Sequence, residues 1–328
     1  MNQDSFSTKY QAQWQRFEQW LDSQDKTIPA AKRPKFTDTR EIPHLYRQLC
    51  HHLALAQSRH YSAHLTDYLN QLVLRGHQYL YQSRVNSRYG FLRFLFDEFP
   101  NLIRARWKLF WIAALLFYGP FAGMVIAIQQ SPDLVYSVLP PQQVSQYREM
   151  YDPKSEHIGR NRESSDDFLM FGFYIKNNIS IGFQTFAGGM LFGLGTLFYL
   201  IFNGLITGAV TGHLIEIGYT KTFLAFIIGH GAFELTAIVI AGMAGMNLGL
   251  ALISPGQLTR LDALKRASSD SMKMVYGVIL MLVIAAFIEA FWSSKGALDP
   301  SIKFTVGALL WSFVGLYLLF AGRRRRAT

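Results

Sequence analysis

The sequence predicts an all-α, polytopic integral membrane protein with about six transmembrane helices, an N-terminal cytoplasmic helical region and an interfacial elbow helix between the two. Half of the 328 residues are hydrophobic and only 16% are charged, against about 25% charged in an average soluble domain. The charges are also uneven. Residues 1–108 hold 16 Lys and Arg and 9 Asp and Glu, whereas residues 181–254 hold only Lys221, Glu216 and Glu234. This asymmetry excludes a single soluble domain, a disordered chain and a fibre.

A short amphipathic helix is expected near the start of the chain. Trp14, Phe17 and Leu21 are spaced three and four residues apart, so they share one face of a helix over residues 11–24. Residues 26–43 contain three prolines and are expected to be a linker.

A longer helical stretch is expected from Pro43 to about Gln82, with leucines along one stripe. We expect this stripe to close a small helical bundle, with partner binding as the alternative. Both helical stretches belong to a cytoplasmic region of residues 1–107, which precedes a transmembrane domain of residues 108–328.

Residues 86–107 interleave aromatic and leucine side chains with arginines. A helix that is apolar on one face and basic on the other lies well at a membrane surface. Because this stretch leads directly into an apolar run, it is expected to be an elbow helix, with a soluble core helix as the alternative. The side chains concerned are Phe91, Leu92, Phe94, Leu95 and Phe99, and Arg88, Arg93, Arg104 and Arg106.

Apolar runs of about 20 residues predict the spans, because a helix of that length crosses the roughly 30 Å hydrocarbon core. Leu109 to Ile128 is such a run without a charge. The apolar stretch of residues 181–217 is too long for one crossing, and Asn203-Gly204 in its middle predicts a break. A re-entrant hairpin within residues 181–253 is the alternative. The expected spans are residues 109–128, 181–202, 204–218, 223–245 (with an extension to 253 as the alternative), 274–292 and 304–321.

The charges of the loops predict the topology through the positive-inside rule. Residues 1–108 carry a net charge of +7, residues 129–180 carry −2 and residues 254–273 carry +2. We therefore expect both termini and the 254–273 loop in the cytoplasm, and the 129–180 loop outside it, in a bacterial inner membrane. Six crossings agree with this arrangement, because they bring the four arginines at 323–326 to the cytoplasm.

The net charge of +10 does not indicate nucleic acid as a partner, since the basic residues flank apolar runs. The single cysteine, Cys50, excludes an intramolecular disulfide and a zinc site built from several cysteines. The N-terminus lacks the apolar core of a signal peptide, so insertion is expected to start from an internal segment.

Small residues recur every four positions in the apolar region. This spacing lets helix backbones approach closely in lipid. We expect packing within one chain, with contact between copies in a homo-oligomer as the other use. The helix-packing residues are Gly189, Gly193, Gly204, Gly208, Gly212, Ala241, Gly245 and Gly249.

Ionisable residues inside the expected spans form, with Asn203, a candidate buried polar cluster. His230 and Glu234 are four residues apart, so they share one helix face and could hydrogen-bond. Glu289 lies near the outer end of its span. Such residues usually face a bundle interior or a cavity. A structural pair, a proton or ion relay and a metal site are all possible interpretations, although a metal site here would lack a fourth protein ligand. We expect no catalytic residue, no bound metal and no cofactor.

The sequence resembles the stage II sporulation protein M family of bacterial membrane proteins, most strongly over residues 165–295. The resemblance rests on FGFYIKNNISIGFQTFAGGMLFGLGTLFYLIFNGLITGAV, then GHGAFELTAIVIAGMAGMNLG, then AAFIEAF. These stretches carry an Asn-Asn pair, an Asn-Gly pair, a His-Gly-x2-Glu-Leu element and an Ile-Glu pair, in that order. The resemblance implies a multi-span protein of the inner membrane without known catalysis, which in spore formers is a scaffold for cell-wall hydrolases.

Taken together, these features predict a non-enzymatic inner-membrane scaffold or assembly protein that couples cytoplasmic and envelope partners, in cell-wall or envelope remodelling. The expected partners are the lipid bilayer, further copies of the chain, and envelope or cell-wall proteins. The alternative is a transporter or channel lined by His230, Glu234, Glu289 and the segment at Asn203. A membrane-embedded metalloenzyme is a third candidate.

Overall fold

The chain folds into two compact units, Met1–Arg88 and Tyr89–Thr328. The computed structural model describes residues 2–24, 41–81, 87–154, 167–296 and 298–323, and all elements within these ranges are helices. The division lies before the expected boundary at residue 107, so all but the first residues of the elbow segment belong to the larger unit. Most of the expected linker, part of the 129–180 loop and the last three of the four arginines at 323–326 lie outside the described residues.

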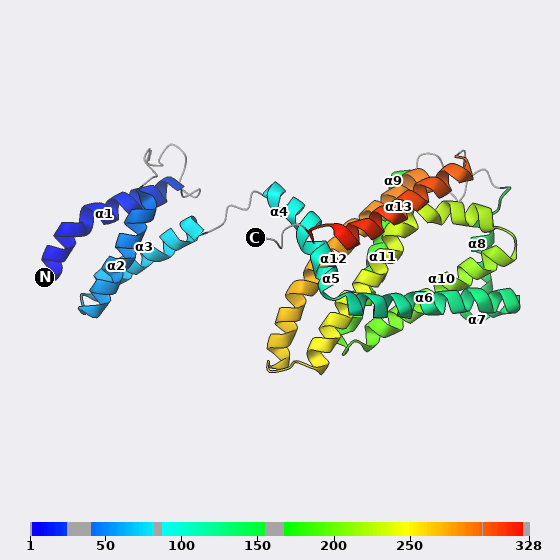
Figure 1. Cartoon of the computed structure of the whole chain (residues 1–328), viewed down its shortest axis with the longest axis horizontal. Coiled ribbons are helices and arrows are strands. Elements are labelled where there is room, and N and C mark those ends of the chain that lie inside the picture. The colour runs from blue at the N-terminus through cyan, green and yellow to red at the C-terminus, as the bar shows by residue number, and fades with distance from the viewer. Residues whose placement is uncertain (1, 25–40, 82–86, 155–166, 297, 324–328) are drawn as a thin grey trace. The chain divides into compact units, whose positions relative to one another are not determined.

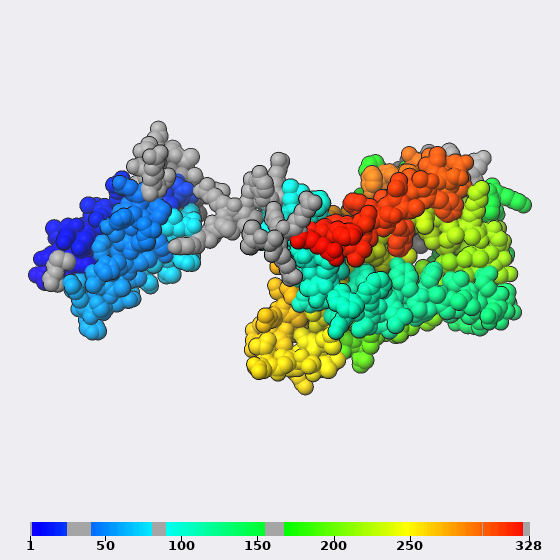
Figure 2. Space-filling view, in the orientation of Figure 1, coloured from blue at the N-terminus to red at the C-terminus, as the bar shows by residue number. Residues whose placement is uncertain are grey.

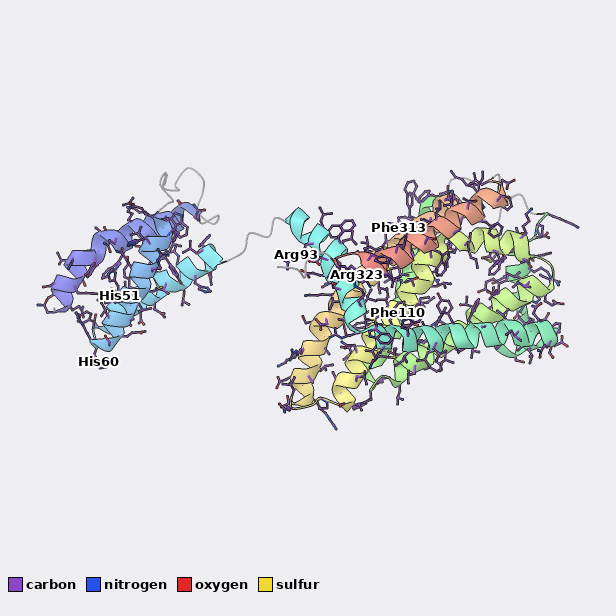
Figure 3. The ribbon with its side chains drawn as sticks, in the orientation of Figure 1. His51, His60, Arg93, Phe110, Phe313 and Arg323 are labelled. Atoms are coloured by element: carbon purple, nitrogen blue, oxygen red, sulfur yellow. The ribbon has the colours of Figure 1, made fainter. Side chains whose placement is uncertain are left out.

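The smaller unit is a bundle of three helices, α1 (Gln3–Gln24), α2 (Ile42–Ser58) and α3 (Ala63–Tyr81) (Figure 1). Its core confirms the expected small bundle. The expected helical stretch from Pro43 to Gln82 consists of two helices, because His60 takes a positive φ of 53° and turns the chain between α2 and α3 (Figure 3). The core is built from the apolar stripes of all three helices: Phe6, Trp14, Phe17, Leu21, Leu49, Leu69 and Leu72.

The elbow segment is helical, as expected, and consists of α4 (Ser87–Arg93), the π-helical turn η2 (Phe94–Glu98) and α5 (Phe99–Ala105). The guanidinium of Arg104 donates to the carbonyl oxygen of Leu318 at 2.6 Å and to that of Ala321. A cation there satisfies carbonyl groups at the C-terminal end of a helix and interacts favourably with its dipole. The elbow thereby fixes the last turn of the chain's final helix.

Five helices of the described part of the chain are long and apolar enough to cross a membrane. They confirm an all-α, polytopic membrane protein (Figure 1). A further helix in the same unit, α9 (Asp167–Ala187), falls outside that group. The five are α6 (Trp107–Gln130), α10 (Leu194–Glu216), α11 (Thr220–Ile253), α12 (Arg260–Ile288) with its π-helical extension η5 (Glu289–Ser293), and α13 (Pro300–Phe320).

The break expected at Asn203-Gly204 is wrong, because α10 runs unbroken through both residues. The chain turns instead between α9 and α10, through the 3-10 turn η4 (Gly188–Met190) and two residues with positive φ, Phe192 at 52° and Gly193 at 83°. Glycine adopts that conformation without a side-chain penalty. The expected spans 181–202 and 204–218 are therefore replaced by the end of α9, a turn, and α10.

The 20-residue loop expected over 254–273 is also wrong. The hydroxyl of Thr259 accepts the backbone N–H of Asp262 at 3.2 Å and caps the start of α12 at Arg260, as Thr commonly does at helix N-termini. The connection therefore shrinks to six residues, 254–259, and α11 extends to Ile253 as allowed for. The paired ends of α11 and α12 protrude from the rest of this unit (yellow in Figure 2).

The segment after α6 folds back onto the helices. It contains η3 (Pro132–Leu134), α7 (Val135–Val138) and α8 (Pro141–Met150). Apolar side chains from this segment are buried in one cluster with residues of α10 and α11. The segment side of that cluster comprises Val135, Leu139, Val144 and Tyr151.

Helix α11 forms the centre of the membrane unit. It packs against α6, α9, α10, α12 and α13, and its buried residues dominate the main hydrophobic core. Its polar side chains are consequently held inside the bundle, where an unpaired polar group is costly.

Candidate functional site

His230, Glu234 and Glu289 meet between α11 and η5. One ligand-type atom from each side chain lies within 4.8 Å of the others. His230 is 5% exposed, and the side chain of Glu234 is 20% exposed. The sequence thus correctly anticipated that these three residues share one place, although 55 residues separate Glu234 from Glu289.

The imidazole of His230 is oriented by Ser293. Its Nδ1 lies 3.0 Å from the hydroxyl oxygen of Ser293, a hydrogen-bond distance. Its Nε2 lies 4.0 Å from the nearer carboxylate oxygen of Glu234, which is beyond a direct hydrogen bond. The expected hydrogen-bonded pair is therefore replaced by a bond from His230 to a different helix.

Lys303 lies on the other side of Ser293. Its ammonium donates to the backbone carbonyl oxygen of Ser293 at 2.8 Å, and the residue is only 1% exposed. Ser293 therefore links α11 to α13, because its hydroxyl contacts His230 and its carbonyl accepts from Lys303. A buried ammonium needs such a partner.

Tyr151, just after α8, is buried beside this group. Its ring packs edge-on against Phe226, with 5.5 Å between ring centroids, and Phe226 packs in the same way against His230 at 5.3 Å. Burial raises the pKa of the Tyr151 hydroxyl well above its usual value, and the charge of nearby Glu289 acts in the same direction. The folded segment after α6 thus covers one side of the cluster.

Asn203 is placed elsewhere. Its side-chain amide donates to the carbonyl oxygen of Tyr199 on its own helix, at 2.7 Å. One turn away, Leu200 packs on Gly242, eight residues or about 12 Å along α11 from Glu234. The structure therefore separates Asn203 from the three ionisable residues with which it was grouped.

The glycines of α10 close a seam with α6. A Cβ at Gly204 would meet the backbone of Phe117, and one at Gly208 would meet that of Phe121 at 2.5 Å. Gly212 continues the series against Val125 and Ile128. Because the partner residue advances by four with each glycine, α6 and α10 run in the same direction.

The other small residues close a second seam at the centre of the unit. A Cβ at Gly189 would strike the backbone of Gly245, and one at Gly249 would lie 2.6 Å from Gly193. Ala241 is fully buried on the same helix as Gly245. Packing within one chain is thus confirmed as a use of this spacing, and a homo-oligomer stays a prediction without support from these faces.

A second polar network lies farther along α11. Arg106 donates through Nε to Asn247 at 2.9 Å and pairs with Asp270 at 2.5 Å. Asn247 in turn donates to the hydroxyl of Ser271 at 3.0 Å, and this hydroxyl donates to the carbonyl oxygen of Ala244. Thirteen residues, or about 20 Å of helix, separate Asn247 from Glu234, so the two polar groups are distinct.

Sequence reasoning missed the supporting residues of both polar groups. Asn247 and Lys303 were visible as polar residues in apolar runs, which is the signal that identified His230. Ser293 and Tyr151 gave no comparable signal, because their roles depend on contacts between segments far apart in the chain.

The membrane unit and the N-terminal unit match different family models. The model described as stage II sporulation protein M matches residues 112–294, and a domain of unknown function matches residues 4–82. An uncharacterized protein of Methanocaldococcus jannaschii is 32% identical to the chain over 137 residues, which make up 39% of this chain and 74% of that protein. No solved structure matches the chain.

Proposed function

The chain belongs to the stage II sporulation protein M family, and we propose on that basis that it is a non-enzymatic assembly protein of the bacterial cytoplasmic membrane. In this proposal the N-terminal unit binds cytoplasmic partners and the 129–180 loop binds envelope proteins. The observation that carries the proposal is the division into a membrane unit and a separately packed three-helix unit.

The packing of the membrane unit supports a structural role. Its glycine seams are closed within one chain, and its two polar groups connect helices to one another. A bundle tied together in this way is suited to holding an attached unit at the membrane. The N-terminal unit has its own apolar core and needs no contribution from the spans to bury it.

The proposed topology has six crossings, with both termini in the cytoplasm. Its support is the parallel packing of α6 and α10, because a chain that leaves α6 on one side must return before α10 starts. Helix α9 has 21 residues, about 31 Å at 1.5 Å per residue, which is sufficient for that return crossing.

Cysteine labelling tests this topology. Intact cells are treated with a membrane-impermeant maleimide, using native Cys50 and, in a Cys50→Ala background, Gln142→Cys or Gly256→Cys. We expect labelling only at position 142, in exposed α8. Labelling of Cys50 or of position 256 would contradict the six-crossing arrangement.

Partner capture with a matched pair of variants tests the assembly role. Leu69 is fully buried in the N-terminal core, so Leu69→Asp places a charge there and disrupts that unit. Asp67→Asn changes an exposed residue on the same helix and is the control. We expect a stoichiometric partner to co-purify from native membranes with wild type and Asp67→Asn, and to be lost with Leu69→Asp. Equal capture by all three proteins would contradict the proposal.

Ion transport is the second candidate, and its support is the convergence of His230, Glu234 and Glu289 between α11 and η5. The broken helix at Asn203 no longer supports it. Proton flux into liposomes containing wild type or Glu234→Gln distinguishes the two functions, because glutamine cannot titrate. Flux in wild type that is lost in the variant favours transport, whereas no flux in either favours assembly.

A further inference from the structure

We propose that His230, Glu234 and Glu289 bind one divalent transition-metal ion, for which Zn²⁺ is the probe, between α11 and η5. The donor set is one imidazole nitrogen and two carboxylate oxygens within 4.8 Å of one another. Zinc is bound by these ligand types, and three protein ligands leave a fourth position for water. The site goes beyond the assembly role, and metal binding is measured without any partner.

The imidazole of His230 is arranged as in metal sites. A metal-bound histidine typically uses its second nitrogen to hydrogen-bond a neighbouring group, which fixes the tautomer and the orientation of the ring. Here Nδ1 bonds the hydroxyl of Ser293 at 3.0 Å. With the Nδ1 hydrogen donated to that hydroxyl, Nε2 keeps its lone pair for a metal ion and lies 4.0 Å from a carboxylate oxygen of Glu234.

The spacing of the donor atoms favours a shared ion over direct pairing. The 4.0 Å between Nε2 and the carboxylate oxygen of Glu234 exceeds the 2.7–3.2 Å of a hydrogen bond. Bond lengths of about 2.0–2.2 Å and tetrahedral geometry place two zinc ligands roughly 3.3–3.6 Å apart. The widest pair, at up to 4.8 Å, must close by about 1.2 Å when the ion binds, a movement that rotation of the glutamate side chains can supply.

The charges of the site also favour a cation. Two carboxylates lie close together among apolar helices, where buried negative charge is costly. A divalent cation would offset two negative charges at one point.

The backbone of η5 is the independent structural observation. Residues Glu289–Ser293 form a π-helical turn, and such turns within α-helices occur frequently at functional sites. The first residue of the turn supplies a proposed ligand, and the last supplies the hydroxyl that orients His230. Next to His230, a Cβ at Gly229 would lie 2.8 Å from the ring of Trp292, so α11 and this turn are in close contact beside the proposed ligand.

Metal titration of the purified full-length protein tests the proposal. The protein carries an affinity tag without histidines, is stripped with a chelator, and is titrated with Zn²⁺ and with Co²⁺ as a spectroscopic probe. We expect one tight site per chain, a visible Co²⁺ spectrum of nitrogen and oxygen ligation, and a higher melting temperature with Zn²⁺.

Three variants locate the bound ion. Glu234→Gln and Glu289→Gln keep the size of the side chain but remove a charged ligand, and should weaken binding at least about tenfold. Glu216→Gln, at the exposed end of α10, is the matched control and should bind as wild type does. If a ligand variant fails to fold, the stoichiometry, spectrum and melting shift of wild type decide the question. Absence of a tight site in wild type, or equal affinity in all variants, would overturn the proposal.

Discussion

Replacing Gly208 with alanine should open the seam between α6 and α10. The added Cβ would lie 2.5 Å from the backbone oxygen of Phe121, 3.0 Å from its Cα and 3.1 Å from Cβ of Met124. An ordinary carbon contact needs about 3.5 Å, so the two helices must separate by about 1 Å. A backbone oxygen cannot rotate away as a flexible side chain can, so the strain spreads along the whole seam.

The magnitude follows from two opposing terms. Overpacking of this kind costs about 1–3 kcal/mol, and the rigid contact places Gly208→Ala near the upper value. Alanine regains about 1 kcal/mol relative to glycine inside a helix, which leaves a net loss of about 2 kcal/mol. Gly123 in α6 has nothing within 4 Å of an added Cβ, so Gly123→Ala keeps only the gain.

Both variants gain the same free energy from the higher helix propensity of alanine, so this contribution cancels when they are compared. The remaining difference in stability measures the steric overlap between α6 and α10. Their stabilities should differ by about 3 kcal/mol, or about 6–12 °C in melting temperature for a unit of this size. Thermal unfolding in detergent, followed by circular dichroism, measures the difference. Equal melting temperatures would refute the close approach of α6 and α10 at this position.

Two further predictions concern other parts of the chain. Arg106→Gln should destabilise the membrane unit by about 1.5–3 kcal/mol, because hydrogen bonds to a charged group are lost. A double-mutant cycle with Asp270→Asn measures how much of this loss comes from the ion pair at 2.5 Å. Strictly additive losses in the cycle would show that the two residues are not energetically coupled. In the N-terminal unit, Trp14 donates to Nδ1 of His52 at 3.1 Å, and burial, followed by the charge of His51, lowers the pKa of His52. The unfolded state therefore binds more protons below about pH 6.5, so this part of the stability is present at neutral pH and is lost on acidification. The protection factors of the α1 amides, which correct for the intrinsic pH dependence of hydrogen exchange, should fall as the pH falls from 7 towards 5. His52→Gln should flatten that dependence; an unchanged dependence in the variant would assign it to another group.

The sequence was sufficient to predict the class of fold and most of the spans. The charge-free run from Leu109 to Ile128 predicts α6 within two residues at either end, because length and apolarity are all that a membrane span requires. The turn before α10 could not be located from the sequence, because a glycine in an apolar run can indicate either a turn or a close contact between helices. Gly193 provides a positive φ at the turn, whereas Gly204 lets two helices approach, and the residue type alone does not distinguish them.

The candidate site was only partly predictable. His230 and Glu234 share a face because they are four residues apart, and Glu289 was found because a carboxylate is rare in an apolar run. Ser293 was beyond reach, since its bond to His230 connects residues 63 positions apart. The local pattern of residues does not predict that contact, because it depends on how α11 packs against η5.

The parallel seam between α6 and α10 constrains the order of events during synthesis. Phe121 and Gly208 are 87 residues apart, so at about 5–20 residues per second the ribosome needs roughly 4–17 s to supply the partner of α6. During that interval α6 must reside in the bilayer with lipid or an insertion factor against the face that α10 later covers. Because the side chains of α6 are mostly apolar, the helix can remain in contact with lipid until α10 has been synthesised. The glycine-rich α10, which has less side-chain surface of its own, enters after its partner is already in place.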